Sequence, residues 1–330
     1  MAQNLVIANA QYSDVPSISI PTQGGGSASF VDTTDADAVA EDILEGKTAY
    51  VNGTKVIGTG TGGSATKYGI SIDDLLGEVN ASGQLQLPTG GNVDLVVSGF
   101  TSINSYVFNY KFARSNAIKS AVFPDLEHAN GTSCFDRAFN NCTQLISVSF
   151  PKLVSANGQS AFSYSFQGDT KLKTASFPLL EEATQSNAFQ YMFGGCTLLE
   201  NIDFSSLRVV GSSSATSTNY RQFYYTFQNC NKLTSISFPA LEEIWCNGTA
   251  ANTGTFAYNN KITKLYFPKL SHIGKASGYS NSTGANNIFY SCTALTEIHF
   301  AAENQAAIEA TTGYSTKWGA PSTCTIYFDL

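Results

Sequence analysis

The chain has 330 residues, of which 42% are hydrophobic and only 13% are charged, and its formal net charge is −7. The charged share is about half of the roughly 25% that is usual for soluble domains. Without a basic stripe, the chain is not expected to bind nucleic acid, because phosphate backbones require clustered Lys and Arg. No segment approaches the roughly 20 apolar residues of a membrane span, so membrane insertion is also excluded from the predicted functions.

The first part of the chain, residues 1–64, is predicted to be a small β-rich module. Gly-rich breaks separate strand-like segments up to residue 30, and a short capped helix is predicted near residues 35–44. Asn52 and Gly53 predict a type I′ hairpin turn, and the Gly/Ser-rich segment 58–66 predicts a flexible linker. The first residues lack the basic and apolar regions of a secretory signal, so we expect the chain to be made in the cytoplasm.

Residues 65–104 are predicted to cap a run of internal repeats, because a repeat array must cover its first open edge. The repeats occupy residues 105–330 and are anchored on a Phe that returns at intervals of 27, 27, 27, 34, 29 and 33 residues. An aliphatic residue follows each anchor at offset six, an apolar residue at nine and another Phe at eleven. The seven anchors are Phe112, Phe139, Phe166, Phe193, Phe227, Phe256 and Phe289.

Each repeat is predicted to form a short helix, a turn, a strand and a return. Offsets nine and eleven alternate with mostly polar residues at eight and ten, which indicates a strand with one buried face. In the first five repeats a second Phe lies four residues before the anchor, and such an aromatic pair favours one turn of helix. Stacked repeats would form an α/β solenoid with a parallel sheet, which the C-terminal segment 325–330 is expected to close.

The repeated phrase F-x-x-C-x-x-L-x-x-I-x-F-P-x-L resembles the BspA-like class of leucine-rich repeats over roughly residues 105–300. The common leucine-rich consensus places Asn or Cys after the strand. Here Leu153 lies in that region and Cys142 lies before the strand, which favours the BspA-like class.

The residue three positions after each anchor, which we call the slot, is interpreted as a structural ladder. The slot accepts Ser, Cys, Asp or Asn, all small and able to bond to the backbone of the next coil. No C-x-x-C pair is present, so no metal and no cofactor are expected. A disulfide between neighbouring slots is sterically possible, but Asp and Asn interrupt the series. The slot residues are Ser115, Cys142, Asp169, Cys196, Cys230, Asn259 and Cys292; Cys134, Cys246 and Cys324 share no register.

A second resemblance concerns residues 40–59, with the pattern A-x-D-I-L-E-G-K-T-A-Y-V-N-G-T-K-V-x-G-T. It is similar to a module of tail-fibre and other virion proteins of phages that infect Gram-positive hosts. The resemblance implies a virion structural protein, located in the virion and homo-oligomeric, that contacts other virion proteins through residues 1–64. Its repeat domain would bind a host-surface protein or glycan. The alternatives are a BspA-like bacterial adhesin or interaction protein, and a β-rich extension without a set partner.

The outward strand positions, at offsets eight and ten, change along the array and suggest a ligand site. They are small in the first repeats, whereas the last two repeats carry charged and aromatic residues of the kind that anchor interfaces. A solvated sheet face with ordinary variation is the simpler alternative. The candidate ligand residues are Lys264, Tyr266, Glu297 and His299 on the strands, and Tyr220 and Tyr279, with Trp245, in or near the longer inserts.

An enzyme is not expected. A glycan depolymerase would need two or three facing carboxylates, and the only candidates are Asp203, Glu242, Glu243 and Glu297. No residue is therefore assigned a catalytic role.

Overall fold

The structure is a computed structural model, which describes residues 92–213, 222–245, 256–274, 287–311 and 313–330. It also describes positions 84, 85 and 87 and the backbone of the strands before residue 72. The chain divides into two units, residues 1–64 and 65–330, and each is considered by itself.

The first unit contains three antiparallel strand pairs, β1 with β2, β3 with β4 and β5 with β6. The last pair flanks Asn52 and Gly53, where the sequence predicts a hairpin. The helix predicted at 35–44 and the linker at 58–65 lie outside the described residues. The strands are β1 (Gln3–Ile7), β2 (Ala10–Val15), β3 (Ser17–Pro21), β4 (Ser27–Val31), β5 (Thr48–Val51) and β6 (Thr54–Ile57).

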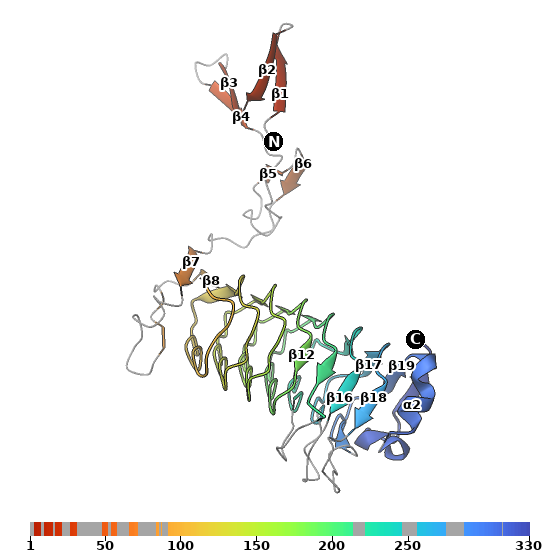
Figure 1. Ribbon diagram of the computed structural model, residues 1–330. Coiled ribbons are helices and arrows are strands. Elements are labelled where there is room, and N and C mark those ends of the chain that lie inside the picture. The colour runs from red at the N-terminus through yellow and green to blue at the C-terminus, as the bar shows by residue number, and fades with distance from the viewer. Residues whose placement is uncertain are drawn as a thin grey trace. The chain divides into compact units, whose positions relative to one another are not determined.

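The second unit is a solenoid whose coils lie side by side (Figure 1). Each coil passes through a face made of turns, then a strand of a first parallel sheet, then a strand or bridge of a second parallel sheet. The first sheet has two segments, ordered β13-β11-β10-β9-β8-β7 and β15-β17-β19-β20. Its strands are β7 (Thr66–Ser71), β8 (Val93–Ser98), β9 (Ile118–Val122), β10 (Ser147–Ser149), β11 (Thr174–Ser176), β13 (Asn201–Asp203), β15 (Ser235–Ser237), β17 (Lys264–Phe267), β19 (Glu297–Phe300) and β20 (Thr325–Phe328).

The second sheet follows the Leu that comes after each first-sheet strand. Its order is β12-β14-β16-β18, and isolated parallel bridges through His128 and Ser155 continue it toward the first coils. Its strands are β12 (Glu182–Ala183), β14 (Val209–Val210), β16 (Glu243–Trp245) and β18 (His272–Gly274).

The expected strand pattern is confirmed. Val148, at offset nine, is buried and pairs in register with Ala121 on one side and Ala175 on the other. Its neighbours Ser147 and Ser149 are half-buried on the outward face. The 27-residue interval therefore superimposes equivalent residues of successive coils, which is why one register holds along the sequence.

The prediction of a short helix in each repeat is wrong, so the unit is a β-solenoid and not an α/β solenoid. On the turn face, the Phe108 and Phe112 N–H groups donate to carbonyls of the next coil at 2.8 and 2.9 Å. An α-helix would have used those groups internally. Every fourth residue instead adopts a left-handed conformation, as at Tyr106 (φ 65°) and Tyr110 (φ 54°). This four-residue turn period, and not a helix, produces the i, i+4 spacing of the aromatic pair.

Columns of stacked Phe rings run through the core, together with buried aliphatic residues of each coil. Phe123 and Phe150 stack with centroids 4.7 Å apart, as do Phe135 and Phe162. Stacked or edge-to-face aromatic pairs contribute about 0.5–1.5 kcal/mol each beyond area burial. These pairs help to offset the cost of about 1–2 kcal/mol for each left-handed residue that is not Gly.

Coil six departs from the register of the sequence. Its anchor, Phe256, stacks on Phe223 with ring centroids 4.8 Å apart. Phe223 lies four residues before the anchor of coil five, so Phe256 continues the column formed by these preceding Phe residues and not the column of the anchors. Asn259 lies beside the end of the anchor column: its Oδ1 accepts from the Phe227 N–H at 2.8 Å. Its Nδ2 donates to the carbonyls of Phe256 and Phe223. The Asn259 amide therefore satisfies backbone groups at the point where the anchor column ends.

Both ends of the solenoid continue the first sheet. At the first end, β7 and β8 pair in parallel ahead of β9. At the other end, β20 pairs with β19, which confirms the last strand predicted from 325–330. Short helical segments precede β20: η3 (Ala302–Asn304), α2 (Gln305–Glu309) and η4 (Tyr314–Gly319). Within the described ranges, no helix is long and apolar enough to span a membrane.

Candidate functional site

Four sequence-predicted residues come together on strands β17 and β19. Lys264 pairs in register with Glu297, and Tyr266 with His299. These residues alternate with the buried Leu265 and Ile298, so the period of two along each strand places all four on the outward face.

Strand β20 adds a third row to this group. Its Tyr327 pairs in register with His299, and Asp329 follows directly after the strand. We call the six residues Lys264, Tyr266, Glu297, His299, Tyr327 and Asp329 the C-terminal patch.

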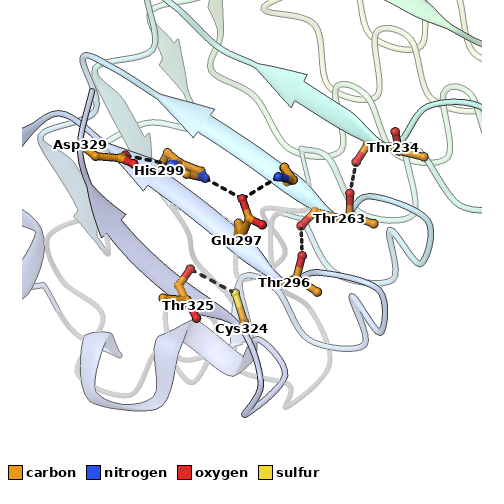
Figure 2. A network of polar contacts seen from close by, with 9 residues as sticks. Thr234, Thr263, Thr296, Glu297, His299, Cys324, Thr325 and Asp329 are labelled. Atoms are coloured by element: carbon orange, nitrogen blue, oxygen red, sulfur yellow. Dashed lines mark hydrogen bonds and ion pairs between the residues drawn. The ribbon is translucent and has the colours of Figure 1, made fainter.

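A continuous polar network connects the four non-tyrosine residues of the patch (Figure 2). The Glu297 Oε2 lies 2.8 Å from the Lys264 Nζ and 3.1 Å from the His299 Nε2. The other ring nitrogen of His299, Nδ1, lies 2.8 Å from the Asp329 Oδ1. A neutral imidazole has only one N–H, whereas an imidazolium donates from both nitrogens and would satisfy both carboxylates.

An aromatic stack crosses the same residues. The His299 ring lies between those of Tyr266 and Tyr327, with both centroids 4.7 Å away and interplanar angles of 18° and 11°. His299 is only 9% exposed, whereas Tyr327 is 38% exposed. The stack therefore presents a fixed aromatic surface with charged groups at its border.

The charges in the patch stabilise one another. Hydrogen bonds from Lys264 and then from His299 hold the pKa of the Glu297 carboxyl below its ordinary value. The hydrogen bond and charge of Glu297 in turn raise the pKa of Lys264. Both groups therefore stay ionised near neutral pH, and the patch carries both signs of charge.

Threonine side chains support the beginning of these strands. The Thr263 Oγ1 donates to the Thr234 carbonyl at 2.9 Å, and the Thr296 Oγ1 donates to the Thr263 carbonyl at 3.1 Å (Figure 2). These bonds tie each coil to the preceding one and fix the backbone on which the patch is built.

Sequence reasoning missed Tyr327 and Asp329. A signal was available, because Ile326, Tyr327 and Phe328 repeat the offsets nine, ten and eleven of the other coils. The other predicted ligand residues, Tyr220 and Tyr279, lie outside the described residues. Trp245 lies on the second sheet and not on the patch strands, and its ring contacts that of His272 at a tilt of 36° with centroids 4.0 Å apart.

Most slot residues contact the backbone of the preceding coil, not the next one as we expected. The Cys142 thiol donates to the carbonyl of the preceding anchor, Phe112, at 3.0 Å. Cys196, Cys230 and Cys292 contact the preceding anchors at 3.0, 3.1 and 3.0 Å. Ser115 bonds within its own coil, accepting from the Ala117 N–H.

The slot cysteines lack the properties of a reactive centre. Burial raises the pKa of Cys142 and Cys196 well above the ordinary thiol value and that of Cys292 to about 12. A thiol held in this way is neither a nucleophile nor a metal ligand. Among the described residues, no three His, Cys, Asp or Glu side chains form a metal-binding group, and Cys246 lies outside them.

The carboxylates considered for glycan hydrolysis are divided between the first and second sheets and already have partners. Glu242 pairs with Arg208 at 3.3 Å, and Glu243, on the second sheet, accepts from the Trp245 ring N–H at 2.7 Å. Asp203, on β13, accepts from the Ser205 N–H at 3.0 Å, and Glu297 belongs to the patch.

The parallel sheets, stacked Phe columns and repeated register define a leucine-rich repeat protein of the β-solenoid type. The protein-family model described as "BspA type Leucine rich repeat region" matches the sequence in six copies, over residues 101–225, 166–284 and 224–315. These matches cover more than half of the chain, which therefore belongs to the BspA-type leucine-rich repeat family.

Among solved structures, a leucine-rich repeat protein from Bacteroides ovatus ATCC 8483 is similar at 17% identity and a TM-score of 0.26. The similarity covers 62% of this chain and 63% of that protein, which is less than two thirds of its length. No curated protein matches the chain.

Proposed function

We propose that the chain is a non-enzymatic interaction protein of the BspA-like kind, whose repeat domain binds a cell-surface protein or glycan through the C-terminal patch. The observation that carries the proposal is the Tyr266–His299–Tyr327 stack, which lies between charged side chains at one end of an otherwise small-residue sheet. Rigid aromatic groups bordered by charges are the residue types that dominate binding energy at protein interfaces.

The virion-protein hypothesis is the second candidate. It rests on the resemblance of residues 40–59 to a phage module, whereas the family matches lie within residues 101–315. The matches therefore support the adhesin or interaction hypothesis and give no support to the virion hypothesis. Neighbouring genes distinguish the two, since tail or capsid genes would favour the virion protein, and secretion or sortase genes would exclude it.

The binding experiment uses fluorescently labelled full-length chain on intact bacterial and animal cells. One variant replaces Lys264, Tyr266, Glu297 and His299 by Ala. The matched control replaces Ser147 and Ser149, at the same positions of β10, and should leave binding unchanged. Circular dichroism verifies that both variants fold.

We expect the patch variant to lose binding by at least about fivefold, because truncation of an anchor residue costs more than about 1 kcal/mol. Binding that survives in this variant, or that falls equally in the Ser147 and Ser149 control, would exclude the patch as the binding site.

A further inference from the structure

The turn face carries an ordered column of side chains that the proposed function does not use. The column consists of the left-handed residue two positions before each anchor in the first five coils. It continues with the left-handed Tyr258, whose ring stacks on that of Tyr225 in coil six. We call these six residues the tyrosine column: Tyr110, Arg137, Tyr164, Tyr191, Tyr225 and Tyr258.

The column is continuous over six coils. Centroid distances are 4.7 Å between Tyr164 and Tyr191, 4.4 Å between Tyr191 and Tyr225 and 4.1 Å between Tyr225 and Tyr258. The rings lie within 9° of parallel. The Arg137 guanidinium lies over Tyr164 at 4.4 Å and over Tyr110 at 5.4 Å.

Each member of the column is fixed by the backbone of its neighbour. The Tyr164 N–H donates to the Gln190 carbonyl at 2.8 Å, and the Tyr191 N–H donates to the Tyr224 carbonyl at 2.9 Å. The column is therefore pre-organised, so a partner would not have to order these side chains on binding. Tyr110 is 43% exposed, and the other members are half-buried, so their outer parts reach solvent.

The chemistry of the surface is aromatic and rich in hydroxyl groups. A phenol O–H can both donate and accept a hydrogen bond. Burial, together with the neighbouring tyrosines, raises the pKa of Tyr191 and Tyr225. These phenols consequently keep their protons throughout the physiological range.

The spacing of the column is close to the repeat of a polyproline II segment. Successive tyrosine rings of the column lie 4.1–4.7 Å apart, so two steps span about 8.5–9.1 Å. A polyproline II segment has three residues per turn and rises about 3.1 Å per residue, which gives a repeat of about 9.3 Å. Such a segment therefore places equivalent groups opposite every second member of the column.

The hydrogen-bonding groups of the column also complement those of a proline-rich segment. Polyproline II has no internal hydrogen bonds, and Pro has no backbone N–H, so a proline-rich segment presents carbonyl acceptors only. The Tyr225 phenol is already hydrogen-bonded to the phenols of Tyr191 and Tyr224, and a phenol that accepts such a bond keeps its own O–H as a donor for the segment. The rings supply aromatic contact area of the kind that lines known polyproline II grooves. Five steps at the ring spacing of the column match a segment of about seven residues at about 3.1 Å each.

We propose that the tyrosine column binds a proline-rich protein segment in the polyproline II conformation. This surface lies on the turn face and is separate from the C-terminal patch on the first sheet. The two proposals can therefore fail independently. A role of the column in stability alone is the alternative that the experiment must separate from binding.

The test measures fluorescence polarisation of a labelled oligoproline peptide of about ten residues during titration with the full-length chain. A Gly-Ser peptide of equal length is the control ligand. The diagnostic variant carries Tyr191→Phe and Tyr225→Phe, which keep both rings and remove both hydroxyls. The matched control carries Tyr266→Phe and Tyr327→Phe, which remove two hydroxyls from the C-terminal patch.

We expect the chain to prefer oligoproline over Gly-Ser and the diagnostic variant to bind oligoproline about tenfold more weakly, as for the loss of one or two hydrogen bonds. The control variant should bind as the parent chain does. A thermal unfolding midpoint equal to that of the parent chain would show that the diagnostic variant is folded. Absent binding, equal binding of Gly-Ser, or unchanged affinity of the folded diagnostic variant would overturn the proposal, as would preferential binding of soluble dextran.

Discussion

Replacing Asp169 by Asn tests the structural role of the slot residues. Asp169 is completely buried, and its Oδ1 accepts from the Cys142 N–H at 2.7 Å. Its Oδ2 has no hydrogen-bond partner within the described part of the chain. Burial raises the pKa of this carboxyl well above its ordinary value, and the bond from Cys142 opposes the shift. Asn keeps the acceptor and cannot ionise, so we expect Asp169→Asn to increase the unfolding free energy at neutral pH.

The sign and size of the effect follow from proton linkage. A carboxyl with a raised folded-state pKa stabilises the folded chain below its unfolded pKa of about 3.9. This stability is lost as the pH rises toward the folded-state pKa, at a rate of about 1.4 kcal/mol per pH unit. Because Asn has no such loss, the advantage of Asp169→Asn should grow at this rate above about pH 4 and level off above the folded-state pKa.

The assay is urea unfolding followed by circular dichroism from about pH 4 to about pH 8. Asn259→Asp is the matched control because it places a carboxyl at the slot of coil six. It should reduce the unfolding free energy increasingly as the pH rises. Identical pH dependence of the parent chain and Asp169→Asn would refute the reasoning, and so would a parent chain that is the more stable one throughout.

Three further predictions concern the slot, the patch and the cysteines. Asn259→Ala should lower the unfolding free energy by about 2–4 kcal/mol, because buried backbone groups lose their partners. The neighbouring Asn260→Ala removes only solvent-exposed bonds to Asn229 and should cost about 1 kcal/mol or less in the same denaturation assay. Lys264→Ala should raise the Glu297 pKa toward its ordinary value in an NMR titration. With Lys264 present, the stability contributed by Glu297 exists above its unfolded pKa and is lost as the pH falls through the lower folded-state pKa; an unchanged Glu297 titration would contradict the network. In a Cys246→Ser background, a thiol reagent should label the native chain only as fast as it unfolds, because burial raises the pKa of the described thiols.

The repeat register was predictable because the sequence contains it seven times. A buried apolar residue at offset nine and a Phe at offset eleven must face the same core in every coil. The parallel strands followed from this periodicity, and the structure confirms them. The helix prediction failed because a four-residue period is common to a helical turn and to a run of tight turns. Only the backbone bonds to the next coil distinguish the two, and those bonds join residues about one repeat apart.

The candidate site was partly predictable for a similar reason. Lys264, Tyr266, Glu297 and His299 stand out because the equivalent positions of earlier coils are small. Tyr327 belongs to the same row, but it lies after the last anchor, in a coil where Lys317 occupies the position of the anchor Phe. Its contribution becomes evident only when β20 pairs with β19.

The sequence by itself determined the repeat length, the buried faces of the strands and the exchange of Cys with other small polar residues at the slot. These are local or periodic properties, fixed by how often an apolar side chain must return to one core. The tertiary structure decided which outward residues meet, since stacking places side chains 27 to 34 residues apart within a few ångströms of one another. The tyrosine column and the contact of Asp329 with His299 exist only through that stacking, because their members lie about one repeat apart in the sequence.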